Sequence, residues 1–325
     1  MSTAPALPFV TVAIGTYNRS RWLWETLEFL TRQAYPADRW ELLIVDNNST
    51  DDTCAVVGSF DKAPKAPRYF FEVKQGSSHA RNRAIAEAAG EILVFLDDDM
   101  LGGLDWIDLI IEPFLRPDAG NIGAVGGEVI PCFPEGLPRW LEGHWEPFNY
   151  RTDVGPLKSN QLPMTANLAL RMSVLKEIGG FRTDLGRFGN RLTGSEDHEL
   201  VRRVRAAGYE IWLSPPAGLR HQIPASRLTF KYTFRLSFDS ARSRVIERSS
   251  HRHTGLLWLL TRIPAYLFRL TLTLVLSLFF LLTFQIGQAK RWACRAGRAA
   301  GYLVEIVCVL KRVLTGWRNH AEPST

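Results

Sequence analysis

Two groups of acidic side chains have the types and spacing to do chemistry. Asp97, Asp98 and Asp99 directly follow the apolar run 92–96, so three carboxylates crowd the end of a predicted buried strand. A divalent cation would relieve their mutual repulsion. Hard oxygen ligands suit Mg²⁺ or Mn²⁺, which often bridge protein carboxylates to substrate phosphates. An acidic surface turn is the simpler alternative, but the position after a buried strand favours a metal site.

The second acidic group is the run EDHE at 196–199, which opens a predicted helix much later in the chain. Acidic residues in a first helical turn often interact with the helix dipole and have no further role. Two acidic groups can also divide one reaction between them. The first then holds metal and diphosphate, and the second supplies a general base. The residues alone leave both explanations open.

Alternating strands and helices must position these side chains. Apolar, β-branched runs predict strands over 9–14, 41–45, 68–73 and 92–96. Helical patterns are predicted over 21–33, 51–60, 78–89, 175–180 and 197–208. Such alternation predicts a doubly wound α/β sheet with parallel strands. The ligand of such a sheet is expected at the carboxyl ends of its strands, where the polar residues gather.

Several common functional motifs are absent. The first predicted strand–helix turn has neither G-x-G-x-x-G nor G-x-x-x-x-G-K-[ST], which argues against a dinucleotide oxidoreductase and a P-loop NTPase. The sequence has no G-x-S-x-G elbow of an α/β-hydrolase. The four cysteines lie far apart without C-x-x-C spacing, so we expect reduced thiols rather than disulfides or a zinc site.

Five motifs follow one another along the chain: VAIGTYNR, LLIVDNNSTDDT, SSHARNRAI, ILVFLDDDM and TGSEDHEL. In this order and approximate spacing they resemble the inverting glycosyltransferases of family 2, and the resemblance extends from Phe9 to Arg244. It implies the GT-A fold, a doubly wound mixed sheet that binds a nucleotide-diphospho-sugar, over residues 1–245. It also implies a divalent metal cofactor, Mg²⁺ or Mn²⁺.

The resemblance assigns the donor and metal sites residue by residue. The residues expected to bind the nucleotide-sugar donor are Thr16, Tyr17, Asn18, Arg19, Asp46, Asn48, Arg81, Asn82, Asp97 and Asp98. Among them, Asp46 would accept a hydrogen bond from the base. Asp99 would bind the metal, with Asp97 and with His221 of the LRHQ segment as further ligands. An ordinary structural histidine is the alternative for His221.

The resemblance also assigns the acceptor side. Asp197, with Glu196 beside it, resembles the family's base motif, and Asp197 would deprotonate the acceptor hydroxyl. Trp106 and Asn167 lie where acceptor contacts are expected, with packing and capping as their alternative roles. The Q-x-x-R-W element of processive polysaccharide synthases is absent after Asp197, so we expect addition of a single sugar to a glycan or polyprenyl-linked acceptor.

Two other functions stay open at this point. In a polyprenyl-phosphate sugar transferase the acceptor is already an anion, so Asp197 would be dispensable. A catalytically silent subunit would bind the nucleotide sugar and organise a membrane complex. The intact acidic motifs argue against the silent subunit.

Basic charge is concentrated at the end of the 325-residue chain. From Gly255 onward there are nine Lys and Arg against two Asp and Glu. The 20 residues Leu270–Ala289 carry no charge, which is enough to cover a hydrocarbon core of ~30 Å. With the apolar run 255–268 and a predicted surface helix over 302–314, residues 246–325 are expected to be a membrane-associated helical region. A buried core helix is the alternative. Nucleic acid is not an expected partner, because the basic residues border apolar helices.

Basic residues flank this apolar run on both sides. They are Arg242, Arg244, Arg248 and Arg252 before it, and Lys290, Arg291, Arg295 and Arg298 after it. A single crossing would put one cluster on the wrong side of the membrane. We therefore predict a re-entrant or in-plane helix pair with its bend between Pro264 and Arg269. Because Met1–Val10 lacks a basic targeting segment, attachment through 255–314 is expected at the cytoplasmic face of the inner membrane.

Overall fold

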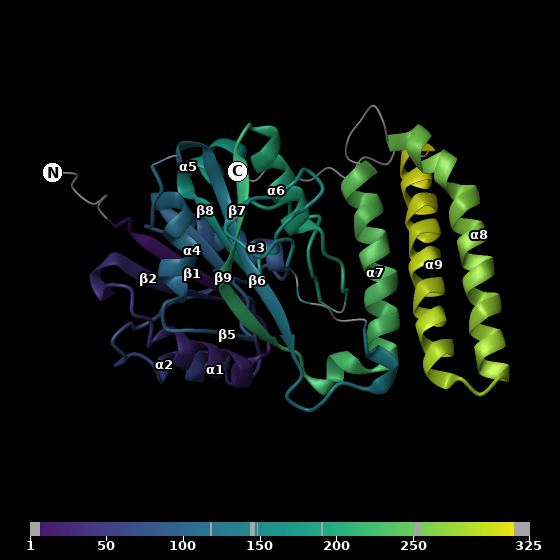
Figure 1. The fold of residues 1–325 in the computed structure, drawn as a ribbon, viewed down its shortest axis with the longest axis horizontal. Coiled ribbons are helices and arrows are strands. Elements are labelled where there is room, and N and C mark those ends of the chain that lie inside the picture. Colours follow the sequence, from purple (N-terminus) through teal and green to yellow (C-terminus); the bar gives the residue numbers. More distant parts are fainter. Residues whose placement is uncertain are drawn as a thin grey trace. The chain divides into compact units, whose positions relative to one another are not determined.

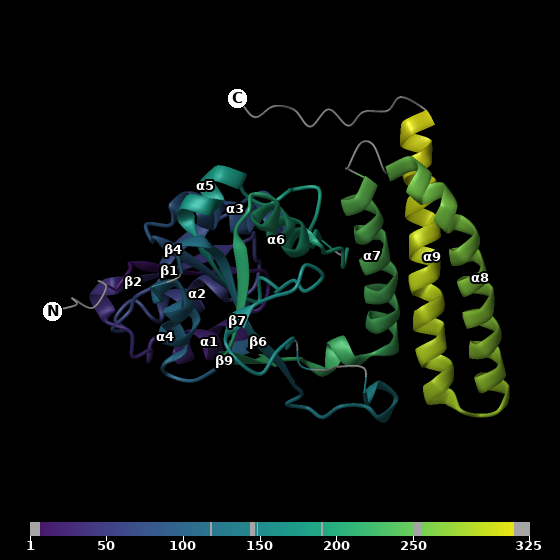
Figure 2. The same cartoon turned by 45° about the horizontal axis from the view of Figure 1, so that its top comes forward.

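The computed structural model describes residues 7–117, 119–143, 147, 149–189, 191–249 and 255–314. Contacts divide the chain into two units, which are described separately below (Figures 1 and 2). The first unit comprises Met1–Gly136, Gly143–Gly189 and Glu196–Pro224. The second unit comprises Leu137–Glu142, Asn190–Ser195 and Ala225–Thr325.

The first half of the first unit confirms the predicted alternation. Its elements are β1 (Val10–Thr16), α1 (Ser20–Leu30), β2 (Trp40–Asp46), α2 (Thr53–Gly58), β3 (Arg68–Phe71), α3 (Ser77–Glu87) and β4 (Ile92–Leu96). The strands pair in parallel in the order β3-β2-β1-β4. The loops after β1, β2 and β4 therefore leave the same edge of the sheet.

The second half makes the sheet mixed. Its elements are β5 (Met100–Leu101), α4 (Trp106–Ile111), β6 (Ile122–Cys132), β7 (Gly155–Pro156), β8 (Asn167–Arg171), α5 (Met172–Ile178), α6 (Glu196–Ala206) and β9 (Glu210–Gln222). Strand β8 runs antiparallel to both β4 and β6. Strand β9 runs parallel to β6 and antiparallel to β5 and β7. An all-parallel sheet is thus wrong beyond β4, whereas the mixed sheet is confirmed.

The two faces of this sheet bury different sets of apolar side chains. On one face Val12 and Ile14 of β1 belong to the same buried cluster as Leu23 and Leu27 of α1. On the other face Ala13 shares a cluster with small residues of α3. Alternate residues of a strand point to opposite faces of the sheet. Because helices cover both faces, every residue of these continuously apolar strands can be buried. This core holds the strand ends, and the loops that follow them, in fixed positions.

The long helices in the described part of the second unit are α7 (Phe230–Ser249), α8 (Gly255–Leu282) and α9 (Ile286–Leu314). Helix α9 contacts both α7 and α8. Glu305 of α9 is buried, and it accepts a hydrogen bond from Arg242 of α7 at 2.9 Å. The expected domain boundary at residue 245 falls inside α7, yet α7 packs along its length on α9. This packing could not be predicted from the sequence of α7, because its buried positions include the polar residues Asp239, Ser243 and Glu247.

The chain does not reverse at the bend predicted between Pro264 and Arg269. Helix α8 continues through Pro264, which is exposed, so the proline disturbs no packing against α9. The chain reverses at residues 283–285 instead, where Phe284 adopts a φ of 59°. The separate surface helix predicted over 302–314 is also wrong. These residues form the second half of α9, where Tyr302 stacks on Tyr266 of α8 with 4.3 Å between ring centroids.

Candidate active site

The three adjacent aspartates at the end of β4 lie in different surroundings. The side chain of Asp97 is 38% exposed, that of Asp98 is 4% exposed, and that of Asp99 is fully buried. One cation separates the two buried carboxylates. Arg19, which precedes α1, contacts Asp98 and Asp99 at 2.6 Å each. Thr16 at the end of β1 donates a hydrogen bond to Asp98 at 2.7 Å.

Arg19 lowers the electrostatic cost of this arrangement. Burial raises the pKa of the Asp98 carboxyl to about 6, and Asp99 acts in the same direction while Arg19 opposes it. Burial alone would lower the pKa of Arg19, but the charges of Asp98 and Asp99 raise it, so this guanidinium stays charged. Part of the repulsion that suggested a metal is therefore relieved by the protein itself.

His221 joins the aspartates through strand pairing. Residue 221 of β9 lies opposite Met100 of β5, and its Nε2 is 3.1 Å from Oδ2 of Asp99. Among the described residues there is no group of three His, Cys, Asp or Glu side chains arranged to hold a metal. Of the three predicted ligands, Asp99 and His221 meet, whereas Asp97 lies 3.6 Å from Arg81. A carboxylate and an imidazole fit a Mg²⁺ or Mn²⁺ ion that takes its other ligands from water and substrate phosphates.

Arg81 of α3 links the two acidic groups of the sequence. Its guanidinium contacts Glu196 at 2.7 Å and Asp97 at 3.6 Å. Ser77 also donates to Glu196, which is 6% exposed. Burial would lower the pKa of Arg81, but Glu196, Asp97 and Asp197 together raise it, so Arg81 senses both groups. The turn after β4 and the start of α6 therefore lie at one site.

The structure separates the roles of Glu196 and Asp197. Glu196 is held by Arg81 and Ser77, and its Oε2 is buried without a hydrogen bond among the described residues. Asp197 is half-buried, and it accepts a hydrogen bond from the backbone N–H of His198 at 2.7 Å. Of the predicted catalytic pair, Asp197 is the accessible carboxylate, and Glu196 fixes the start of α6.

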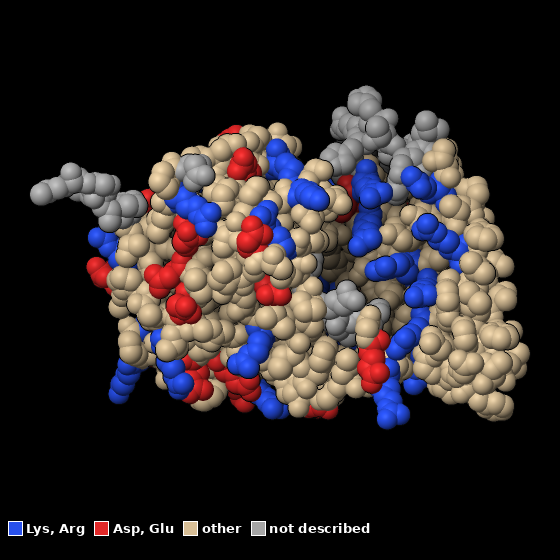
Figure 3. All heavy atoms as spheres, in the orientation of Figure 1, with Lys and Arg blue, Asp and Glu red and all other residues tan. Residues whose placement is uncertain are grey.

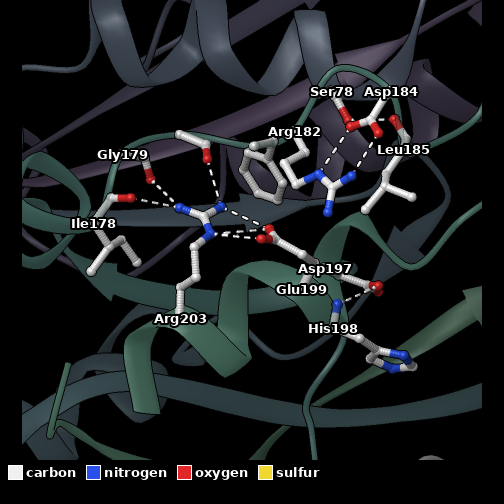
Figure 4. A network of polar contacts seen from close by, with 12 residues as sticks. Ser78, Ile178, Gly179, Arg182, Asp184, Leu185, Asp197, His198, Glu199 and Arg203 are labelled. Atoms are coloured by element: carbon white, nitrogen blue, oxygen red, sulfur yellow. Dashed lines mark hydrogen bonds and ion pairs between the residues drawn. The ribbon is translucent and has the colours of Figure 1, made fainter. Parts of the chain in front are cut away.

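A network missed in the sequence orients α6. Figure 4 shows Arg203 between the end of α5 and Glu199 of α6. Arg203 donates to the carbonyl oxygens of Ile178 and Gly180 at 2.7 Å each, and to Glu199 at 2.9 Å. Carbonyl groups at a helix end lack intrahelical partners, so a cation there is favourable. The i,i+4 spacing of Glu199 and Arg203 was the available signal.

The expected nucleoside-binding loops are held by their own hydrogen bonds. Asp46, which is 2% exposed, accepts from the Ser49 N–H and from the Tyr69 hydroxyl, both at 2.8 Å. Asn18 and Asn48 have positive φ values of 50° and 67°. Asparagine tolerates this region better than most residues. These bonds shape the loops in advance of any ligand.

Further residues of these loops have clear positions. Asn47, not singled out in the sequence, accepts from the Gly76 N–H at 2.7 Å and donates to the Lys74 carbonyl at 2.8 Å. It thereby ties the loop after β2 to the start of α3. Tyr17 is 41% exposed and is available for contact with a ligand.

Three residues predicted to bind a ligand make hydrogen bonds within the protein, and two of them are buried. Trp106 is 1% exposed and donates to Oδ1 of Asn167 at 3.1 Å. Asn167 is fully buried and donates to the Ala217 carbonyl at 2.8 Å, so neither residue can reach an acceptor. Both ends of the Asn82 amide are used by the backbone of Phe181, at 2.7 and 2.8 Å.

Comparisons with known proteins agree with this geometry. The family model described as Glycosyl transferase family 2 matches residues 11–179, more than half of the chain. The chain belongs to glycosyl transferase family 2. It is therefore a glycosyltransferase. The matched region begins in β1 and ends directly after α5.

Relatives of this family 2 chain include proteins of glycan biosynthesis. Glycosyltransferase AglE of Haloferax volcanii is 28% identical over 312 residues, covering 93% of this chain and 97% of the relative. The succinoglycan biosynthesis protein ExoM of Rhizobium meliloti is 26% identical over 247 residues, covering 74% of this chain and 76% of the relative.

Solved structures share the fold of the family 2 chain. Mannosyltransferase PcManGT of Pyrobaculum calidifontis, in complex with GDP-Man and Mn²⁺, matches with a TM-score of 0.59 and 19% identity, covering 97% of this chain and 89% of that one. TarS 1–349 of S. aureus in complex with UDP matches with a TM-score of 0.53 and 16% identity, covering 97% and 94%. These likenesses establish the GT-A fold.

The position of Arg81 yields a stability prediction. Replacing Arg81 with Ala leaves the buried Glu196 without its cation, and such a loss costs about 3–5 kcal/mol. We expect this drop in the free energy of unfolding, and a smaller one for Arg81→Lys, which keeps the charge. Arg83→Ala is the matched control, because it breaks a partly exposed i,i+4 pair on the same helix and should cost less than about 1 kcal/mol. Equal losses in the two alanine variants, measured by chemical denaturation, would contradict the bridging role.

Proposed function

We propose that this chain is a metal-dependent inverting glycosyltransferase. It moves one sugar from a nucleotide-diphosphate sugar to a hydroxyl of a lipid-linked glycan acceptor at the cytoplasmic face of the membrane. The observation that carries the proposal is Arg81, which connects the turn after β4 with the start of α6. A donor-binding edge and a candidate base thereby lie next to one another.

The reaction is a direct displacement at the anomeric carbon. The acceptor oxygen forms a bond to this carbon from the face opposite the diphosphate, and the carbon–oxygen bond to the diphosphate breaks. Asp197 receives the proton of the acceptor hydroxyl as the new bond forms. Arg81 stays charged beside both acidic groups and holds Glu196, so the start of α6 keeps its place during the transfer.

Asp99 and His221 are the residues that would hold the metal. When bound, the ion would neutralise charge on the diphosphate leaving group. The ion fits this position because Oδ2 of Asp99, the residue directly before β5, and Nε2 of His221 on the paired strand β9 lie 3.1 Å apart, close enough to bind one ion. Support for this class of cofactor also comes from PcManGT, a structural relative in complex with GDP-Man and Mn²⁺.

The exposed side of α8 supports attachment to a membrane. The positions of α8 that face its neighbours include Leu259, Tyr266 and Thr273, which are buried and recur every seven residues. Exposed apolar side chains of α8 are Leu260, Leu267, Phe268, Leu272, Leu274, Val275, Leu278, Phe279, Leu281 and Leu282. Figure 3 shows the lower part of the surface over α8 without charged side chains. Exposed apolar area of this extent marks a membrane or protein contact.

The packing of α9 favours a helix pair that lies in the membrane interface. By length and composition Leu259–Leu282 could cross a membrane. However, α9 packs along α8 and carries four basic residues in its first half, namely Lys290, Arg291, Arg295 and Arg298. Crossing would take these charges into or across the bilayer, whereas at the headgroups each adds ~1 kcal/mol of attraction to anionic lipid.

The base is tested by replacing Asp197. Loss of a general base costs about 10²–10⁴ in rate, so Asp197→Asn should lose turnover while it keeps its affinity for the donor. Steady-state transfer and donor titration measure the two quantities. Asp61→Asn is the control, since it changes an exposed carboxylate outside the site. Full activity of Asp197→Asn would rule out Asp197 as base and favour an anionic acceptor such as a polyprenyl phosphate.

The metal site is tested by thermal unfolding with Mn²⁺ and a nucleoside diphosphate. A ligand that binds the folded state raises the melting temperature. We expect this rise in the wild-type protein and its loss in both Asp99→Ala and His221→Ala. Asp61→Ala, which removes an exposed carboxylate, should behave as wild type. If both site variants kept the full Mn²⁺-dependent rise, these two residues would not be the ligands.

The exposed side of α8 is tested with lipid vesicles. The triple variant Phe268→Glu, Val275→Glu, Leu278→Glu places charge where each side chain is more than half exposed, so folding should not suffer. Each lost apolar contact is worth about 1.5–3 kcal/mol, so co-sedimentation with anionic vesicles should weaken at least tenfold. Leu104→Glu alters an exposed apolar residue of the first unit and is the control. Undiminished binding of the triple variant would exclude α8 as the attachment surface.

A further inference from the structure

Arg19 contacts the same carboxylate oxygen that the proposed metal ion would use. Its Nη2 lies 2.6 Å from Oδ2 of Asp99, and Nε2 of His221 lies 3.1 Å from that oxygen. The other arm of the guanidinium, Nη1, lies 2.6 Å from Oδ1 of Asp98. A carboxylate oxygen has two lone pairs, and two partners already engage Oδ2 of Asp99. The expected metal ligand is therefore neutralised by a cation of the protein itself.

Arg19 is held firmly in this place. Its side chain is 19% exposed, and those of Asp98 and Asp99 are 4% and 0% exposed, so both ion pairs are largely shielded from water. Asp98 is fixed in turn, because Thr16 donates a hydrogen bond to its Oδ2 at 2.7 Å. Hydrogen bonds between charged groups are about twice as strong as those between neutral ones. Both oxygens of Asp98 are thus engaged within the protein, and this carboxylate anchors the guanidinium.

The guanidinium and a divalent ion would repel each other strongly at Asp99. Mg²⁺ binds carboxylate oxygens at about 2.0–2.1 Å. Because Nη2 of Arg19 lies 2.6 Å from Oδ2, the two cations would be within about 5 Å of each other, where like charges repel strongly if water is excluded. Binding of the ion therefore requires Nη2 to leave Asp99. A guanidinium that leaves one anion needs another, and the diphosphate of the donor is the anion that arrives with the ion.

We propose that Arg19 makes metal binding dependent on the nucleotide. Without nucleotide, Arg19 occupies Oδ2 of Asp99 and keeps the ion out. With nucleotide, it keeps its contact with Asp98 through Nη1, turns Nη2 toward the diphosphate, and leaves Asp99 and His221 to the ion. Metal and nucleotide then bind together, and each raises the affinity of the other by the same factor. This inference rests on the proposed metal site at Asp99 and His221.

The experiment measures Mn²⁺ binding to the full-length protein by calorimetry, first without nucleotide. Arg19→Gln removes the competing cation and should bind Mn²⁺ about tenfold more tightly than the wild-type protein. Arg19→Lys keeps a charge beside the buried carboxylates, but its single ammonium cannot contact both as the planar guanidinium does, so a gain of about threefold is expected. The matched control is Arg21→Gln, which changes an exposed arginine of α1 that lies over Trp22 and should leave Mn²⁺ binding unchanged.

The second measurement repeats the titration with UDP and with GDP. The wild-type protein should bind Mn²⁺ much more tightly when the nucleotide is present, and this increase should be about tenfold smaller in Arg19→Gln. The gain that Arg19→Gln shows without nucleotide should vanish when Asp99→Ala is added to it, because the ion then lacks its carboxylate ligand. This double variant shows that the gain arises at the proposed site.

Equal affinity of Arg19→Gln and the wild-type protein for Mn²⁺ alone would overturn the inference. A measurement on the wild-type protein gives an independent test, which does not require any variant at position 19 to fold. Mn²⁺ alone should raise its melting temperature far less than Mn²⁺ with nucleotide does. An equally large rise with Mn²⁺ alone, lost in Asp99→Ala, would show that Arg19 does not exclude the ion.

Asp99→Ala distinguishes failure of this inference from failure of the proposed metal site. If Asp99→Ala keeps full Mn²⁺ binding in the presence of nucleotide, the metal assignment fails and the role of Arg19 fails with it. If Asp99→Ala loses this binding but Arg19→Gln and Arg19→Lys bind Mn²⁺ as the wild-type protein does, only the role of Arg19 fails. Loss in Asp99→Ala together with tighter binding in both Arg19 variants supports both.

Discussion

Four carboxylates can gather at one edge of this sheet because two largely buried arginines lie between them. Arg19 contacts Asp98 and Asp99, and Arg81 contacts Glu196 and Asp97. Without these cations the burial of so much negative charge would oppose folding. Each arginine comes from the beginning or body of a helix that follows a strand of the parallel half. The charge balance of the site is therefore built into the α/β alternation.

The mixed half of the sheet supplies the remaining residues of the candidate site. Strand β9 brings His221 opposite Met100, one residue after Asp99. Helix α6 brings Asp197 into the field of Arg81 and is itself fixed by Arg203 on the end of α5. Residues separated by about a third of the chain thus share one charge network. Most charged side chains of the site are paired with another charged side chain.

The sequence allowed prediction of what depends on local pattern. Strands β1 to β4 and helices α1 to α3 follow from apolar runs and helical spacing, and the polar loops follow from the ends of those strands. The roles of Trp106 and Asn167 could not be predicted, since their residue types suit an acceptor site as well as a core, and burial depends on β8 and α4 packing together. The burial of Asp239 and Ser243 on α7 could not be predicted either, because these side chains accept hydrogen bonds from the backbone amides of Leu192 and Gly194, which are distant in sequence.

The position at which the apolar region reverses direction also could not be predicted from local sequence pattern. Proline is the usual breaker of a helix, yet Pro264 lies on the exposed side of α8 and the helix continues. The reversal falls at Phe284, a residue that seldom adopts a positive φ. The packing of α8 against α9, which includes the stacked pair Tyr266 and Tyr302, determines where the chain reverses, and the local conformational preferences of Pro264 and Phe284 do not.

The place of α9 between α7 and α8 bears on how the protein can be shortened. Removal of the apolar helix by ending the chain after α7 would also remove α9, and with it Glu305, the buried partner of Arg242. Helix α7 would then expose the face that α9 covers. Arg242 lies on this face, three residues after Asp239 and one before Ser243. Replacing exposed apolar residues of α8 with polar ones is therefore a better way to remove this apolar surface than truncation, since only the first route keeps α9 and the ion pair between Glu305 and Arg242.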